Sequence, residues 1–193
     1  MPFPFFRLAD GRHSEEKMNI RNIVASALGE FEAWLLSYSW RGKENDCVNL
    51  FAHRFLAYYI APDSVLHDLT QIGIEVCVPK PPKVGIKPAV RKDLVIWREP
   101  LMTTWSAEWT AETFPLAIIE WKARRRQSSA PVLSQYDLNW LTNYSPLQPD
   151  FTGFCVTVDF TSTTRRVASA IVANGQISKD FHRRTNQFVQ PRS

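Results

Sequence analysis

The sequence is poor in the features that mark secreted and membrane proteins. Its three cysteines, Cys47, Cys77 and Cys155, are odd in number and too far apart for a disulfide framework or a CxxC metal pair. No apolar run approaches the ~20 residues that cross a bilayer. The start, "MPFPFFRLADGRH", lacks the basic region and the small-residue cleavage site of a signal peptide. We therefore expect a cytoplasmic location and no membrane partner.

Histidine metal motifs and repeats are also missing. The four histidines have no metal-ligand spacing, and the sequence contains no internal repeat or low-complexity tract. A chain of 193 residues that is 45% hydrophobic and 22% charged has the composition of one ordinary globular domain.

Charge is distributed unevenly along the chain. Residues 1–120 hold 13 Lys and Arg against 15 Asp and Glu, whereas residues 121–193 hold 10 against 4. A basic C-terminal part favours a polyanionic partner such as nucleic acid. A solvated basic face would account for the same asymmetry.

Hydrophobic periodicity predicts helices first and strands later. Helical patterns cover 15–40, 43–60 and about 133–144, and strand patterns cover 72–79, 92–97, 116–122, 151–160 and 165–175. The strands Lys92–Trp97 and Leu116–Lys122 are apolar on both faces, so we expect helices on each side of the sheet and an α/β sandwich. The connection Arg98–Thr113 is long, and it is either a helical excursion or a loop on the substrate side.

The stretch "PLAIIEWKARRR", residues 115–126, runs from a buried strand straight into charge. Because side chains alternate along a strand, Glu120 and Lys122 share one face and Trp121 takes the other. A carboxylate at the end of an apolar stripe is costly unless it is paired or binds a metal. Asp93, on the preceding strand, is placed to approach Glu120, and a hard cation such as Mg²⁺ would relieve their repulsion. The alternatives are an ion pair between Glu120 and Lys122 at a strand end, and a turn residue at Asp93.

These residues resemble a known signature. Asp93, followed by Glu120, Trp121 and Lys122 at the end of an apolar strand, is similar to the D-x(n)-(D/E)-x-K motif of the PD-(D/E)xK nuclease superfamily, which includes restriction endonucleases and DNA repair nucleases. The resemblance implies a restriction endonuclease-like α-β-β-β-α-β core with a mixed sheet flanked by helices. Residues 43–160 read in this order, which predicts a single nuclease domain. Its core would cover about 43–173, with a helical extension at 1–40 and a basic polar tail at 176–193.

The resemblance also implies roles for individual residues. Asp93 and Glu120 would bind Mg²⁺, with Mn²⁺ able to substitute, and the backbone carbonyl of Trp121 would be a further ligand. Lys122 would act on the nucleophilic water. Glu44, on the first core helix, would complete the acidic cluster; alternatively, it is a first-turn acid that the helix dipole favours.

The expected substrate is nucleic acid, DNA rather than RNA, cut by a metal-activated water. Arg124, Arg125 and Arg126 are predicted to contact phosphates, with a solvated loop as the alternative. Gln135, from the helix after the Glu-x-Lys strand, is the predicted polar side chain at the site, with Tyr136 and Asp137 as further candidates. Two tryptophans in the long connection are positioned by sequence to stack on bases; they are Trp105 and Trp109.

Partners and biology are left more open by the sequence. The chain is expected to act as a homodimer or as the nuclease subunit of a larger complex, in restriction, repair, defence or as a toxin. A function of another class is a catalytically silent nucleic-acid-binding or scaffold subunit on the same fold.

Overall fold

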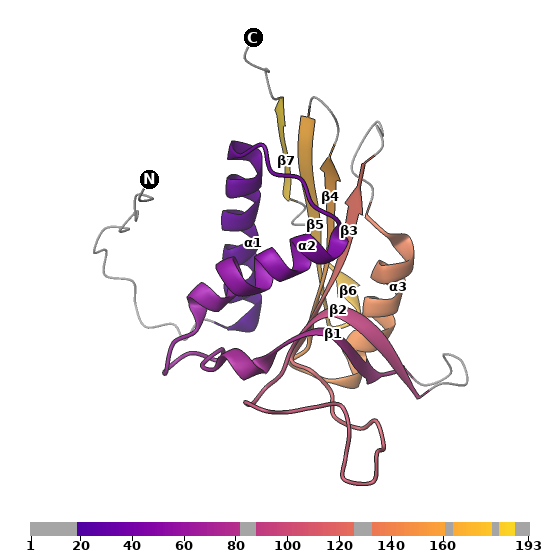
Figure 1. Cartoon of the computed structure of the whole chain (residues 1–193). Helices are drawn as coiled ribbons and strands as arrows, with labels where there is room; N and C mark the ends of the chain where they lie inside the picture. The colour runs from indigo at the N-terminus through magenta and orange to yellow at the C-terminus, as the bar shows by residue number, and fades with distance from the viewer. Residues whose placement is uncertain (1–18, 82–87, 126–132, 161–163, 179–181, 188–193) are drawn as a thin grey trace.

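The computed structural model describes residues 19–81, 88–125, 133–160, 164–178 and 182–187. In this part of the chain one mixed β-sheet is covered by helices on both faces (Figure 1). Helices α1 (Ile20–Ser37) and α2 (Glu44–Leu50) pack on one face, and α3 (Gln135–Tyr144) packs on the other. The protein is therefore an α/β sandwich, as its apolar central strands predicted.

The sheet contains seven strands within the described residues. They are β1 (Ile72–Pro79), β2 (Ala89–Ile96), β3 (Ala117–Arg124), β4 (Thr152–Phe160), β5 (Thr164–Ala173), β6 (Gln176–Ile177) and β7 (His182–Gln187). Their spatial order is β1-β2-β3-β4-β5-β6, and β7 also pairs with β5. Strands β3 and β4 are parallel, and every other neighbouring pair is antiparallel. A parallel pair needs a crossover connection, and α3 provides it.

The first helix forms because its sequence satisfies both its end and its apolar face. Asn19 caps it by accepting a hydrogen bond from the Asn22 N–H at 2.9 Å. Apolar residues recur every three or four positions and are buried against the sheet; among them are Ile20, Ile23, Val24, Ala27, Phe31 and Leu35. The predicted extension at 1–40 thus contributes a helix that is part of the core.

The second helical pattern, 43–60, changes geometry along its length. After α2, the chain continues as a π-helical segment, η1 (Phe51–Leu56), and a 3₁₀ turn, η2 (Ala57–Tyr59). Two further 3₁₀ turns are η3 (Leu69–Gln71) and η4 (Ser145–Leu147). At the start of α2 the Lys43 N–H donates to the Asp46 carboxylate at 2.7 Å, which fixes where the helix begins.

Two apolar cores lie on the two faces of the sheet. The first core, under α1, α2 and η1, centres on Trp121, whose ring meets Phe31 and Phe51 with centroids 5.3 Å away in each case. The second core, under α3, contains Ile118 and Trp140. Glu120 and Lys122 follow Ile118 at intervals of two residues along β3, so their side chains lie on the same face of the sheet, the one that α3 covers.

The order α2-β1-β2-β3-α3-β4 matches the order of elements read from residues 43–160. The observed strand ends differ from the predicted ones by up to three residues: β2 begins at Ala89 where Lys92 was predicted, and β3 extends to Arg124 where Lys122 was predicted. The segment 176–193, expected as a polar tail, contributes strand residues to β6 and β7.

The long connection Arg98–Thr113 forms turns and a single bridge between Trp105 and Ala111, and has no helix among its residues. It joins the end of β2 to the start of β3 and projects below the sheet in Figure 1. Lys122 lies at the other end of β3, so Trp105 and Trp109 are at the opposite end of that strand from the predicted site. Within the described residues, no helix has the length and apolar character needed to cross a membrane.

Candidate active site

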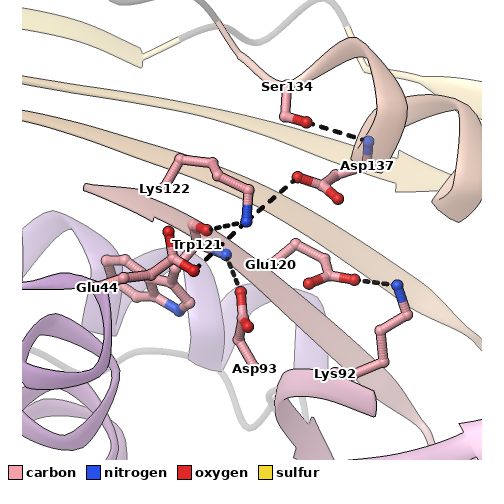
Figure 2. Close-up of polar contacts among 8 residues, drawn as sticks. All are labelled: Glu44, Lys92, Asp93, Glu120, Trp121, Lys122, Ser134 and Asp137. Atoms are coloured by element: carbon pink, nitrogen blue, oxygen red, sulfur yellow. Dashed lines mark hydrogen bonds and ion pairs between the residues drawn. The ribbon is translucent and has the colours of Figure 1, made fainter. Parts of the chain in front are cut away.

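The candidate site lies where strands β2 and β3 separate. The two strands pair over three residues each, Leu94–Ile96 with Ala117–Ile119. Just beyond this ladder the Asp93 carboxylate accepts a hydrogen bond from the Trp121 N–H at 2.7 Å, as Figure 2 shows. The N–H and C=O of one strand residue point to the same neighbouring strand. The Trp121 carbonyl therefore points toward β2, into the space beside Asp93 where the two strands are no longer paired. Asp93 and the Trp121 carbonyl, predicted to act together, are therefore brought together.

A change of face in strands β1 and β2 brings Lys92, the residue before Asp93, to the site. In β1, Ile74 packs on the first core, whereas Val76, two residues later, packs on the second. Glu75 lies between them with φ 57°, and pairing between the strands is interrupted there. Opposite, Leu94 lies in the first core while Lys92 contacts Trp140 in the second. Strict alternation would have put Lys92 on the face away from Glu120.

Lys92 is the partner of Glu120. Its ammonium group is ion-paired with Glu120 Oε1, and both side chains are buried (Figure 2). Lys92 Nζ also lies 3.5 Å from the centroid of the Trp140 ring, a cation–π contact. Burial raises the pKa of Glu120 to about 7 although Lys92 lowers it, and the carboxylates of Asp93 and Asp137 add to the rise. Four charged groups therefore share a poorly solvated space.

Lys122 is held by three oxygen atoms from three elements. Its Nζ donates to the Trp121 carbonyl at 2.6 Å, and it lies 3.5 Å from Glu44 Oε1 and 3.7 Å from Asp137 Oδ2. Burial lowers the pKa of Lys122, but the surrounding carboxylates, Asp137 first, raise it by more. Lys122 is therefore an ammonium ion at neutral pH. This state suits charge stabilisation or water orientation and not proton abstraction.

Glu44 reaches the site from the first turn of α2. It is half-buried, and its ion pair with Lys122 explains its position better than the helix dipole alone does. Burial raises the pKa of Glu44, while Lys122 and the Ala123 N–H oppose the rise. The predicted acid on the first core helix is thus beside Lys122.

Asp137 has the position that the sequence assigned first to Gln135. Its side chain is 6% exposed and points at Lys122, whereas Ser134 caps the helix by accepting from the Asp137 N–H at 3.3 Å. Gln135 is exposed and donates its side-chain amide to Asn139 at 2.8 Å, and Tyr136 is exposed as well. The available signal was the helix period, which puts Asp137 on the apolar face with Leu138 and Leu141.

The predicted arginines follow Lys122 along the chain. Arg124 lies two residues after Lys122, on the same face of β3, and is paired across the strands with Asp159 of β4. Burial raises the pKa of Asp159, and the charge of Arg124 lowers it by less. Arg125 is exposed, and Arg126 lies outside the described residues. Glu75, at the break in β1, is exposed and pairs with Arg91 at 3.7 Å.

The donors present are compatible with a divalent cation. No group of three or more His, Cys, Asp or Glu in the described ranges is arranged to hold a metal. The implied donor set is two carboxylates and the Trp121 carbonyl. Each carboxylate has a second oxygen and a carbonyl has two lone pairs, so the contacts to Lys92, Lys122 and the Trp121 N–H leave acceptors for an ion. Among the described residues, the carboxylates of Glu44, Asp93, Glu120 and Asp137 carry four formal negative charges, against two positive charges on Lys92 and Lys122. The formal difference is the charge of one divalent ion.

Comparison with known proteins adds no family to this picture. No family model, no curated protein and no solved structure matches the chain.

Proposed function

We propose that this protein is a metal-dependent nuclease of the restriction endonuclease-like class, which hydrolyses phosphodiester bonds in nucleic acid, DNA in preference to RNA. The observation that carries the proposal is the hydrogen bond from the Trp121 N–H to Asp93. It fixes one carboxylate beside Glu120 and Lys122, which come from a segment 27 or more residues later in the chain. Two carboxylates and a lysine that converge at a break in a sheet form an arrangement suited to phosphoryl chemistry.

In this proposal Asp93, Glu120 and the Trp121 carbonyl hold Mg²⁺ or Mn²⁺. A divalent ion at such a site supplies a water of lowered pKa and neutralises charge on the phosphate oxygens. Lys122, protonated and fixed by Asp137 and Glu44, donates hydrogen bonds to the attacking water or to the charge that develops on phosphorus.

The basic residues that follow Lys122 extend this proposal to the substrate. Arg124 lies two residues further along the same strand face, about 7 Å on at the usual strand rise. A guanidinium there would contact a phosphate next to the scissile one, and Arg125 would act from the exposed end of the strand. The excess of basic residues after Glu120 supports nucleic acid as the partner.

An isosteric pair of variants tests the proposal. Asp93→Asn keeps an oxygen that accepts from the Trp121 N–H but removes the charge that binds a cation. Asp150→Asn is the matched control, because Asp150 is exposed and pairs with Arg98 at 3.2 Å beyond the opposite end of β3. Linear, circular and single-stranded DNA and RNA are incubated with each protein in Mg²⁺, Mn²⁺ or EDTA. We expect cleavage by wild type and Asp150→Asn in either metal, and about a hundredfold less by Asp93→Asn.

A wild-type protein that cuts none of these substrates in either metal would refute the nuclease proposal. Loss of activity in Asp150→Asn as large as in Asp93→Asn would show that the site lies elsewhere.

One observation favours a second function, a catalytically silent nucleic-acid-binding subunit. The ammonium of Lys92 already neutralises Glu120, so the site is partly compensated without metal. Under this alternative the protein shifts DNA in a gel equally in Mg²⁺ and EDTA and leaves it uncut.

A further inference from the structure

A buried ammonium group lies against one of the proposed metal-binding carboxylates. Lys92 is 3% exposed, its Nζ is ion-paired with Glu120 Oε1, and the ring of Trp140 covers it at 3.5 Å. Figure 2 shows Lys92 and Lys122 on opposite sides of Glu120, so the two ammonium groups do not share a position.

Stability alone does not account for a lysine here. Taking two charges out of water costs several kcal/mol per ion, of order what their attraction returns, so a buried pair adds little over apolar residues of similar size. Apart from the carboxylates of the site, the core that Lys92 faces is apolar, and Val90 and Val95 belong to it. A lysine at this position therefore supplies charge more than packing.

We propose that the Lys92 ammonium is a permanent positive charge of the site, on the inner side of Glu120. It limits the site to one divalent ion, which is held on the side of Asp93 and the Trp121 carbonyl. This assignment rests on the proposed nuclease function and specifies its metal count. Mg²⁺ keeps several waters when it binds a protein. A hydrated ion does not fit where a buried ammonium is already enclosed by a carboxylate and an aromatic ring, and like charge repels it.

The position of Lys92 also predicts its effect on metal affinity. A positive charge in contact with Glu120 competes with any ion that uses the same carboxylate. Replacing Lys92 by methionine removes this competitor and keeps most of the side-chain volume. The metal-free variant then has an uncompensated buried carboxylate, so it loses stability that a bound ion restores.

The test counts bound Mn²⁺ by the electron paramagnetic resonance signal of the free ion, without nucleic acid. Wild type is expected to bind one Mn²⁺ per chain, and Asp93→Asn to lose it, which locates the ion. Lys92→Met, which vacates the inner side of Glu120, is expected to bind its first Mn²⁺ at least about tenfold more tightly and to take up a second. Arg91→Met is the matched control: it removes the same charge from the adjacent residue of β2, but Arg91 is exposed and pairs with Glu75. Its affinity should stay within about twofold of wild type.

Each result decides a separate point. Two Mn²⁺ per wild-type chain, or equal affinities for Lys92→Met and Arg91→Met, would overturn the role of Lys92 and leave the nuclease proposal standing. Absence of Mn²⁺ binding by wild type would overturn both. If Lys92→Met does not fold, the wild-type count and its loss in Asp93→Asn still decide whether one ion or two is held.

Discussion

Replacement of Lys122 by methionine is expected to weaken the fold through Asp137. The ammonium of Lys122 lies 3.7 Å from Asp137 Oδ2, and no hydrogen-bond donor reaches that oxygen among the described residues. The carboxylate is buried, so it depends on Lys122 for compensation. Methionine keeps the length of the side chain and removes the charge.

The size of the effect follows from the exposure of each partner. The side chains of Lys122 and Glu44 are both 36% exposed, so water screens their pair and its loss costs about 0–1 kcal/mol. Asp137 is only 6% exposed, and a buried polar group that loses its partner costs about 1–3 kcal/mol. The expected loss for Lys122→Met is therefore about 2 kcal/mol, which lowers the melting temperature by roughly 4–8 °C for a chain of this size.

A second substitution separates charge from packing. Asp137→Asn in the Lys122→Met background removes the buried charge, so the double variant is expected to recover about 1–2 kcal/mol of stability. Asp137→Asn alone should lose about 0.3–1 kcal/mol, since Asp137 is also a first-turn acid of α3. Cleavage should remain at least about a hundredfold below wild type in both proteins that lack Lys122.

Stability is measured by urea unfolding of the four proteins, with Arg91→Met as a control for loss of an exposed positive charge. The reasoning fails if Lys122→Met is as stable as wild type, or if the double variant is no more stable than Lys122→Met. Recovery of cleavage in the double variant would show that Lys122 acts on the fold and not on the substrate.

Three further predictions concern the rest of the chain. Gly153→Ala should lose about 1–3 kcal/mol in urea unfolding, because a Cβ there would lie 2.9 Å from Leu141 Cδ2 in the packed second core, and an unchanged midpoint would contradict this packing. Gly29→Ala should gain about 0.5–1 kcal/mol, because Gly29 lies inside α1 with nothing within 4 Å of the added methyl group; a loss of stability would count against this assignment of the helix. Burial raises the pKa of Cys47 and of Cys155 to about 12, so in the native protein at pH 8 a thiol reagent should modify only the half-buried Cys77 quickly; fast modification of all three would contradict their burial.

Local pattern was sufficient for the order of helices and strands in residues 43–160 and for the shared face of Glu120 and Lys122. Alternation predicted that Glu120 and Lys122 share a face, because the side chains of any strand alternate whatever lies around it. The apolar runs of β2 and β3 predicted helices on both faces of the sheet for a similar reason: buried strands need apolar residues on each side. The predicted order of a helix, three strands, a helix and a strand is also the observed one.

Pairing within the site was not readable from the sequence. The interpretation of Glu120 and Lys122 as partners of each other was open, but Glu120 pairs with Lys92 and Lys122 pairs with Glu44 and Asp137. Asp137 was ranked below Gln135, because the sequence does not show how α3 is rotated over the sheet.

The sequence by itself determined the apolar strands and the shared face of Glu120 and Lys122, since these depend on residues a few positions apart. Only the tertiary structure decided that Asp93 accepts the Trp121 N–H, that Lys92 compensates Glu120, and that Glu44 and Asp137 hold Lys122 from two helices. The reason is physical: the strand pair β1–β2 is irregular at Glu75 and Asp93. Side chains beyond such an irregularity point to the face opposite to the one that strict alternation predicts.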